Sequence, residues 1–413
     1  MKTTIINGQV TLLRPLEGPL APHIVSFAQW MSEQGYSSYS LQRQVRLASE
    51  FSRWLTQNGV ALTDLSSLHP EQYLCHRARK VRIGRGDAAA LRYLMAFLRR
   101  AEAIPADEEL PAATTPVECC VEAFERYLRE ERALASATIV NYLPFVRELL
   151  TQRFGNAEVQ LSELRASDVV GFVQRRAHQL HIKRAKLMAT ALRSFLQYAR
   201  YRGDITLDLA AAIPPVANWS MTSIPRAIAD DQVHALLASV DRSTALGRRD
   251  YAILLLLARL GLRSSEVAFL ELDDIDWTAG SLSVCAKGGR RVELPLPADV
   301  GGAIVAYLQH GRPHSRSRRL FLRHKAPVRG FLSQCAIGSV VHHAIERAGV
   351  QAPTHGTHQF RHALATRMLR GGASLIEIGA LLGHRSPETT KIYTKVDIDA
   401  LRGLALPWPG GGQ

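Results

Sequence analysis

The chain has 413 residues, of which 46% are hydrophobic and 21% charged, and this composition excludes a largely disordered protein. It carries 51 Lys and Arg against 37 Asp and Glu, and the formal net charge of +14 favours a polyanionic partner, nucleic acid above all. No apolar run approaches the roughly 18 residues of a membrane-spanning helix, and no secretory leader is expected at residues 1–8. The five cysteines form no CxxC pair, which disfavours a disulfide framework or a zinc site and suits a reducing cytosol.

The chain is expected to be mainly α-helical, with one interval of β-strand. Near its start, Asn7-Gly8 between two β-prone runs predicts a hairpin with a two-residue turn. Pro, Ala and acidic residues gather over residues 104–116, and prolines recur over 213–225, so we predict two linkers there. The linkers divide the chain into a helical domain at residues 1–105, a second helical domain at 117–213 and a C-terminal domain at 225–413.

The two helical domains resemble each other in sequence. The segment beginning at Phe27 has a counterpart 97 residues later at Phe124, Leu62-Thr63-Asp64-Leu65 has one at an offset of 99, and Leu91-Arg92 has one at 101. Offsets that drift so little indicate a duplicated helical unit, although any two amphipathic bundles share apolar residues at helical spacing. Basic residues of the second unit either clamp phosphates or form a solvated face; they are Arg175, Arg176, Lys183, Arg184, Lys186, Arg193, Arg200 and Arg202.

The C-terminal domain begins with an apolar segment, residues 248–260, that predicts a buried helix. Gly261-Leu262 interrupts it, and a further helical turn is expected from Arg263 to Val267. Two strands follow, predicted over residues 281–286 and 292–296. A basic Gly-Gly turn joins them and places Lys287 at the end of the first strand.

Three more helices are expected near the C-terminus. The first opens at a Thr357 cap, so that His358 and Arg361 share a face near its positive end, where a phosphate would be bound. The second, residues 374–382, ends at Gly383 with His384 directly behind it. Ser386-Pro387 starts the third, which carries Tyr393.

Taken singly, these residues have ordinary structural roles, such as a surface ion pair for Arg263 or a helix cap for His384. Together, two arginines, a lysine, two histidines and a tyrosine suit a phosphodiester, because fixed cations hold the phosphate and a hydroxyl attacks it. The candidate catalytic residues are Arg263, Lys287, His358, Arg361, His384 and Tyr393.

In this order the six residues resemble the catalytic residues of the tyrosine recombinases, the phage integrase family. The matches are Arg263 in Gly-Leu-Arg-Ser-Ser-Glu-Val, Lys287 in the turn, His358 and Arg361 as His-x-x-Arg, His384 in Leu-Leu-Gly-His, and Tyr393 as nucleophile. Residues 117–213 resemble the family's helical core-binding (SAM-like) domain by pattern. The resemblance thus implies a mainly α fold in which helical core-binding domains precede a catalytic domain with a small β-sheet. The first 105 residues have no standard counterpart unless they duplicate the core-binding module.

The resemblance implies that Tyr393 attacks a DNA phosphate, leaving a 3′-phosphotyrosyl link and a free 5′-hydroxyl. Arg263 and Arg361 would hold the phosphate oxygens, with His384 donating to one of them. Lys287 is the candidate general acid and His358 the candidate base. Glu266, one turn after Arg263, is expected to orient the basic groups. No metal or other cofactor is expected.

The partner implied is double-stranded DNA, acted on by a homotetramer that holds two sites, in the cytoplasm with the nucleoid. The expected function is site-specific recombination in DNA integration, excision or transposition, with a need for accessory directionality proteins left open. Three alternatives remain at this point: a type IB topoisomerase that nicks and swivels DNA, a non-catalytic DNA-binding regulator on this fold, and an RNA-binding helical protein.

Overall fold

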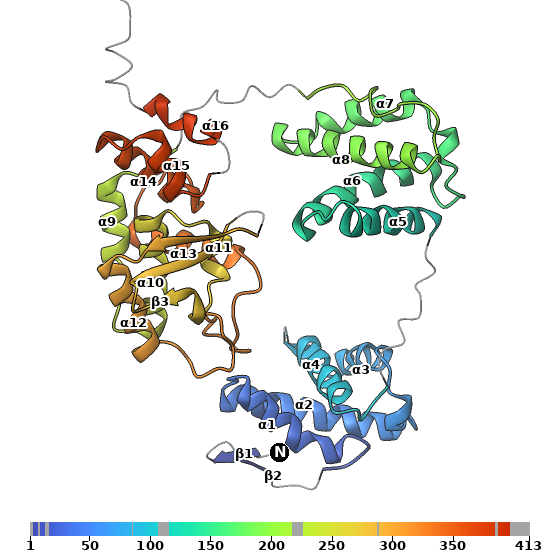
Figure 1. The fold of residues 1–413 in the computed structure, drawn as a ribbon. Coiled ribbons are helices and arrows are strands. Elements are labelled where there is room, and N and C mark those ends of the chain that lie inside the picture. Colours follow the sequence, from blue (N-terminus) through green and yellow to red (C-terminus); the bar gives the residue numbers. More distant parts are fainter. Residues whose placement is uncertain are drawn as a thin grey trace, which may run out of the picture. The chain divides into compact units, whose positions relative to one another are not determined.

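The computed structural model describes residues 3–6, 9–12, 16–84, 86–105, 115–216, 226–286, 289–384 and 387–396 (Figure 1). By their internal contacts, residues 1–107 and 223–413 form one compact unit and residues 108–222 form the other. Both unit boundaries fall within the segments predicted as linkers. No helix in the described ranges is long and apolar enough to cross a membrane.

The N-terminal helical group follows a short hairpin. Strands β1 (Thr3–Ile6) and β2 (Gln9–Leu12) pair antiparallel with Ile6 opposite Gln9, as the hairpin prediction requires; Asn7 and Gly8 lie outside the described residues. Phe27, Phe51 and Leu94 are buried in the core of the group. Its helices are α1 (Ala21–Glu33), α2 (Ser38–Gln57), α3 (Leu68–Ala78) and α4 (Asp87–Arg100), with a 3₁₀ turn, η1 (Leu62–Asp64), before α3.

The second helical group has the same sequence of elements. The Thr115 hydroxyl caps α5 by accepting a hydrogen bond from the Glu118 backbone N–H, and Pro116 occupies the first helical position. Phe124, Phe172 and Phe195 are buried in its core. Its elements are α5 (Pro116–Glu130), α6 (Ser136–Phe154), η2 (Leu161–Glu163), α7 (Ala166–Ala177) and α8 (Ile182–Tyr201).

The two groups repeat the same contacts among aromatic rings. Phe27 and Trp30 stack with their centroids 6.2 Å apart, and both lie against Phe97, at 5.6 and 5.7 Å. In the second group Phe124 and Tyr127 stack with their centroids 6.4 Å apart, and they lie against Tyr198 at 5.3 and 4.7 Å, respectively. Each trio joins the first helix of its group to the last.

An ion pair between the second and third helices is repeated as well. Glu50 of α2 pairs with Arg77 of α3, and Glu148 of α6 pairs with Arg176 of α7 at 3.0 Å. Glu148 follows Glu50 by 98 residues, and Arg176 follows Arg77 by 99. The ion pair therefore recurs at positions that the sequence repeat relates.

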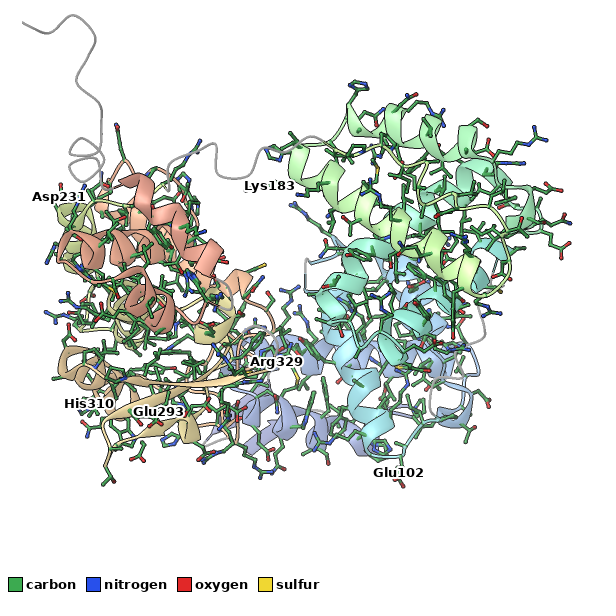
Figure 2. All side chains as sticks on the ribbon, turned by 45° about the horizontal axis from the view of Figure 1, so that its top comes forward. Glu102, Lys183, Asp231, Glu293, His310 and Arg329 are labelled. Atoms are coloured by element: carbon green, nitrogen blue, oxygen red, sulfur yellow. The ribbon has the colours of Figure 1, made fainter. Side chains whose placement is uncertain are left out.

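The basic residues of the second group divide into two sets. Arg176, Arg193 and Arg200 bond to the protein itself: Arg193 donates to the carbonyls of Ile213 and Pro214, and Arg200 pairs with Asp208 at 2.9 Å. Lys183 and Lys186 are exposed at the start of α8, and Figure 2 shows Lys183 on the outside of the group. Some of the basic residues of the second group are therefore structural, and others face solvent.

The C-terminal group has α10 (Ala245–Leu260) at its centre. Its residues 252–258 are all buried, which confirms the prediction of a helix with apolar residues on every side. A three-stranded antiparallel sheet of order β3-β4-β5 lies within the same group (Figure 1). Strands β4 (Ser281–Cys285) and β5 (Arg291–Pro295) lie within a residue of their predicted bounds, and β3 covers Ile275–Asp276.

The remaining elements surround α10 and the sheet. They are α9 (Asp230–Ala238), α11 (Ser264–Ala268), η3 (Leu272–Asp274), α12 (Ala298–His310), α13 (Cys335–Ala348), α14 (His358–Arg370), α15 (Leu375–Leu381), α16 (Pro387–Thr390) and η4 (Lys391–Val396).

Two local predictions for this group need correction. Thr357 is the N-cap residue of α14, as predicted, but its side chain makes no capping hydrogen bond. Its hydroxyl lies 2.6 Å from that of Ser264 and so joins the starts of α11 and α14. The last helix does not continue through Tyr393. It ends at Thr390 and becomes a 3₁₀ turn, in a run rich in β-branched residues, which disfavour the α-helix.

Candidate active site

The Arg263 side chain is held at the start of α11. Gly261 ends α10 in the left-handed conformation, at φ +59°, and a Cβ there would lie 2.9 Å from a Leu364 methyl. Two residues after Gly261, Arg263 donates hydrogen bonds from its backbone N–H and from its Nη1 to the Glu266 carboxylate, both at 2.7 Å. The Glu266 side chain is only 4% exposed. The expected contact of Glu266 with a basic group is therefore present, and it fixes the direction of the Arg263 guanidinium.

The Arg361 side chain is buried and faces the same region from the first turn of α14. Its Nη1 donates to the carbonyl of Gly261 at 2.8 Å, and its Nη2 donates to the carbonyl of Leu382. Burial and then the charge of Arg263 lower the pKa of Arg361 to about 10, so it remains a cation at neutral pH. The guanidinium thus connects the ends of α10 and α15.

Tyr393 lies in η4 and is only 2% exposed. Its hydroxyl is 3.1 Å from Nδ1 of His362, and the two ring centroids are 5.6 Å apart. Burial raises the pKa of Tyr393, while the charges of Arg361 and Arg263 oppose that rise. The hydroxyl is therefore protonated at neutral pH and lies within the field of both arginines.

His384 is a second imidazole beside the Tyr393 ring. The two rings are nearly parallel, at 6° with centroids 6.4 Å apart, and Nδ1 of His384 lies 2.8 Å from the buried Thr390 hydroxyl. Burial, with the charges of Arg361 and Arg263, lowers the pKa of His384 to about 4. The imidazole is therefore neutral at pH 7.

The structure brings four of the six predicted residues together: Arg263, Arg361, His384 and Tyr393. His358 is exposed at the first position of α14, and its charge contributes to lowering the pKa of His362. Lys287 lies outside the described residues. Next to it, the backbone N–H of Ala286 donates a hydrogen bond of 2.8 Å to the backbone carbonyl of Arg290 across the predicted turn.

Sequence reasoning missed His362, which contacts the tyrosine hydroxyl. The signal that was available is its spacing from His358: residues four apart lie on one helical face, so a second imidazole was to be expected beside the first. Its contact with Tyr393 spans 31 residues, and no local pattern predicts it.

The lowered pKa values predict that the fold loses stability in mild acid. His362 and His384 are neutral in the folded state but bind a proton near pH 6.5 when unfolded, so the free energy of unfolding falls as the pH drops from about 6.5 toward 4. For the half-buried His384 we expect a loss on the order of 1 kcal/mol, or about 2–4 °C in Tm. Calorimetry at pH 7 and pH 5 should show a larger drop for wild type than for His384→Asn. An equal fall in Tm for the two proteins would contradict the lowered pKa of His384.

Glu266→Gln should slow DNA cleavage about 100-fold, because the Arg263 guanidinium loses the carboxylate that orients it. The matched control is Glu377→Gln. Glu377 binds the Ser374 backbone N–H at the start of α15 in the same way, but it contacts no arginine of the site. Single-turnover cleavage by the two variants measures the difference, and equal rates would show that Glu266 acts only as a helix cap.

Comparisons with known proteins identify the family of the chain. Residues 226–399 match the model of the phage integrase family, and residues 121–203 match its N-terminal SAM-like domain. The chain is 56% identical to a putative integrase/recombinase of Sinorhizobium fredii over 408 residues, 99% of each chain. It is 36% identical to the tyrosine recombinase XerD of Mycobacterium tuberculosis over 230 residues, 53% of this chain and 71% of that one.

Two solved structures share the fold. The XerH site-specific recombinase in a post-cleavage complex aligns with a TM-score of 0.55 and 19% identity, over 71% of this chain and 97% of that one. A lambda integrase dimer bound to a core site aligns with a TM-score of 0.53 and 16% identity, over 71% and 99%. The chain belongs to the phage integrase family of tyrosine recombinases, enzymes that cleave and rejoin DNA.

Proposed function

We propose that this chain is a site-specific DNA recombinase in which Tyr393 is the nucleophile. The observation that carries the proposal is the surroundings of one hydroxyl: the Tyr393 oxygen lies against His362, its ring faces His384, and its pKa is influenced by both Arg361 and Arg263. Among the described residues, no group of three or more His, Cys, Asp or Glu side chains could hold a metal ion. We assign the electrostatic part of the proposed reaction to the cations Arg263 and Arg361.

In the first step the Tyr393 oxygen attacks a phosphorus atom of the DNA backbone. The new oxygen–phosphorus bond leaves a 3′-phosphotyrosyl link, and the bond from phosphorus to the 5′-oxygen breaks. The tyrosine proton passes to a base, for which we retain His358, and Lys287 gives a proton to the leaving 5′-oxygen. The phosphotyrosyl link keeps the energy of the broken phosphodiester bond. A 5′-hydroxyl from another strand can therefore attack this link and rejoin the DNA without ATP.

Arg263 and Arg361 stabilise the negative charge that develops on the non-bridging oxygens. Guanidinium groups pair with phosphate through two hydrogen bonds and stay charged at every relevant pH. The Arg263–Glu266 contact and the two carbonyls bound by Arg361 hold both groups before DNA arrives, so little reorganisation is needed. We assign to His384 a hydrogen bond to a phosphate oxygen.

The burial of Tyr393 adds a step to this mechanism. With 2% of its surface exposed, the side chain cannot reach a phosphodiester until η4 moves outward. We therefore propose that His362 is a positioning residue that holds the hydroxyl while the tyrosine is buried.

The second helical group would contact the phosphates of the duplex through exposed cations such as Lys183 and Lys186. A homotetramer on two DNA sites, assembled on the nucleoid in the cytoplasm, completes the proposal. Lambda integrase forms such a tetramer on a Holliday junction, and a Tn1549 transposon integrase has been captured on a circular intermediate DNA. We include integration, excision and transposition in the proposed role.

The test is covalent capture on a nicked suicide substrate drawn from DNA that flanks the gene. We expect a denaturant-resistant complex with the protein on a 3′-phosphate and a free 5′-hydroxyl. Tight binding without any complex would favour a non-catalytic regulator. Relaxation of supercoiled plasmid without recombinant products would favour the topoisomerase alternative.

A further inference from the structure

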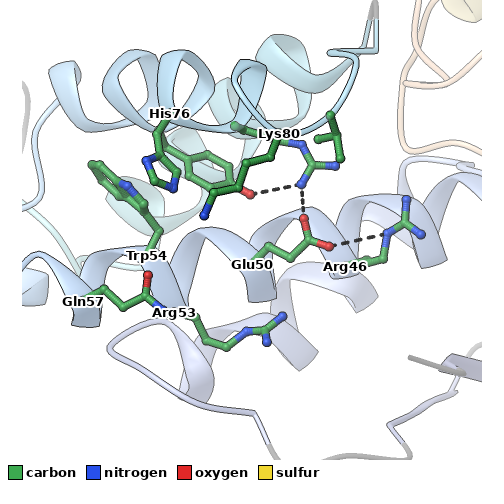
Figure 3. A pocket seen from close by; sticks show the side chains of 10 residues that line it. Arg46, Glu50, Arg53, Trp54, Gln57, His76 and Lys80 are labelled. Carbon is green, nitrogen blue, oxygen red and sulfur yellow. Dashed lines mark hydrogen bonds and ion pairs between the residues drawn. The ribbon is translucent and has the colours of Figure 1, made fainter.

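A cavity opens on the N-terminal helical group, between α2 and the end of α3 (Figure 3). It measures about 430 Å³, and Trp54 and Tyr73 form its buried wall. The polar residues that line it come from α2, from α3 and from the turn after α3, and most of them are basic. They are Arg46, Glu50, Arg53, Gln57, His76, Arg77 and Lys80.

The cavity has more positive charge than its own acid can neutralise. Glu50 is the one carboxylate among the lining residues, and it is shared by Arg77 and by Arg46, whose Nε lies 3.9 Å away. Arg53 and Lys80 are exposed, and within the described part of the chain neither has an acidic partner. Nε of Arg77 is buried without a hydrogen-bond partner. The wall thus presents cations to whatever enters.

The second helical group is uncharged at three of the corresponding positions, although Arg175 takes the place of His76. The Glu50–Arg77 pair has its counterpart in Glu148–Arg176, so the ion pair that joins the two helices is common to both groups. The positions of Arg46, Arg53 and Lys80, however, correspond to the uncharged residues Pro144, Thr151 and Gln179 at the same offsets of 98 and 99. Folding of this helix pair therefore does not require the three cations, and their side chains are available to a ligand.

We propose that the α2–α3 cavity binds a phosphate of the DNA backbone, as a contact additional to those made by the rest of the protein. Arginine forks match phosphate geometry. Arg53 lies on α2 and Lys80 just beyond α3, so cations line the cavity from both elements, and in the proposed complex they bind the same phosphate. The aromatic side chains are buried and offer no face for a base to stack on, which favours sequence-independent backbone contact. This inference rests on the proposed function, because it takes its ligand from that reaction.

The test compares two double variants of the full-length chain. Arg53→Gln with Lys80→Gln removes the two unpartnered cations of the cavity. Arg316→Gln with Lys325→Gln removes the same residue types and the same charge from exposed positions of the catalytic domain. All four side chains are exposed, so both variants should melt within about 2 °C of wild type.

Binding of a long duplex from the flanking DNA is followed by anisotropy across a range of KCl concentrations. The cavity variant should reduce the magnitude of the slope of log K against log salt by about 1, as expected for the loss of one phosphate contact, and raise Kd about tenfold. The control variant should change the slope by much less. Equal slopes for cavity variant and wild type, or for cavity variant and control, would overturn the proposal.

Two further measurements separate the possible failures. If inorganic phosphate shifts the Tm of wild type but not of the cavity variant, while DNA binding is the same for both, the cavity is a small-anion site and the DNA assignment is wrong. Covalent capture on the suicide substrate is run in parallel. If wild type forms the covalent complex and the cavity variant binds DNA with the affinity and salt slope of wild type, this inference alone is overturned. If wild type forms no covalent complex, the proposed function is overturned.

Discussion

Tyr393→Phe should abolish the covalent DNA complex and leave the affinity for DNA within about twofold of wild type. Phenylalanine removes the attacking oxygen and keeps the ring that packs in the small core with Leu364, Ile378 and Leu382. The hydrogen bond to His362 is lost as well, which costs about 0.5–1.5 kcal/mol of stability. Gel analysis under denaturing conditions detects the complex, and anisotropy measures the affinity.

The matched control is Tyr201→Phe. This tyrosine is 77% exposed, and its hydroxyl has no place in the proposed chemistry. Cleavage by that variant should equal wild type. If Tyr393→Phe still forms the complex, another residue is the nucleophile and the arrangement of the site has been misread.

Arg361→Lys should reduce cleavage by about 10²–10³-fold and destabilise the fold by about 2–4 kcal/mol. The guanidinium satisfies two buried carbonyls, those of Gly261 and Leu382, and a single ammonium group cannot reach both in the same geometry. One carbonyl is then left without a donor, and the fork that faces the phosphate is lost. Single-turnover cleavage and thermal unfolding measure the two effects separately.

Arg367→Lys is the control for this substitution. Arg367 lies in the same helix, is partly exposed and pairs with Asp230 at 3.3 Å, so the change should cost less than about 1 kcal/mol and leave cleavage unchanged. If both variants lose stability but neither loses activity at a temperature where they are folded, Arg361 is structural only.

Much of this site could be predicted because several of its residues lie in short sequence patterns that determine local structure. The apolar helix before Gly261, the two strands around a basic turn and the Gly383-His384 step each depend on neighbours within a few residues. The Arg263–Glu266 contact was accessible for the same reason, since residues three apart on a helical turn meet.

The remainder depends on contacts between distant segments. Arg361 bonds to a carbonyl 100 residues away, and the Thr357 hydroxyl joins Ser264 rather than its own helix. The burial of Tyr393 against His362 follows from how η4 packs on α14, which helical periodicity does not determine. The cavity beside Arg53 likewise requires the placement of α2 against α3, which the prediction of a helical domain over residues 1–105 does not determine.

Peptide mapping of the captured complex tests the assignment of the nucleophile most directly. After nuclease digestion, the protein should carry a nucleotide remnant on a single peptide, and fragmentation should place it on the phenolic oxygen of Tyr393. A remnant on any other residue, or a link through the 5′-phosphate, would contradict the mechanism.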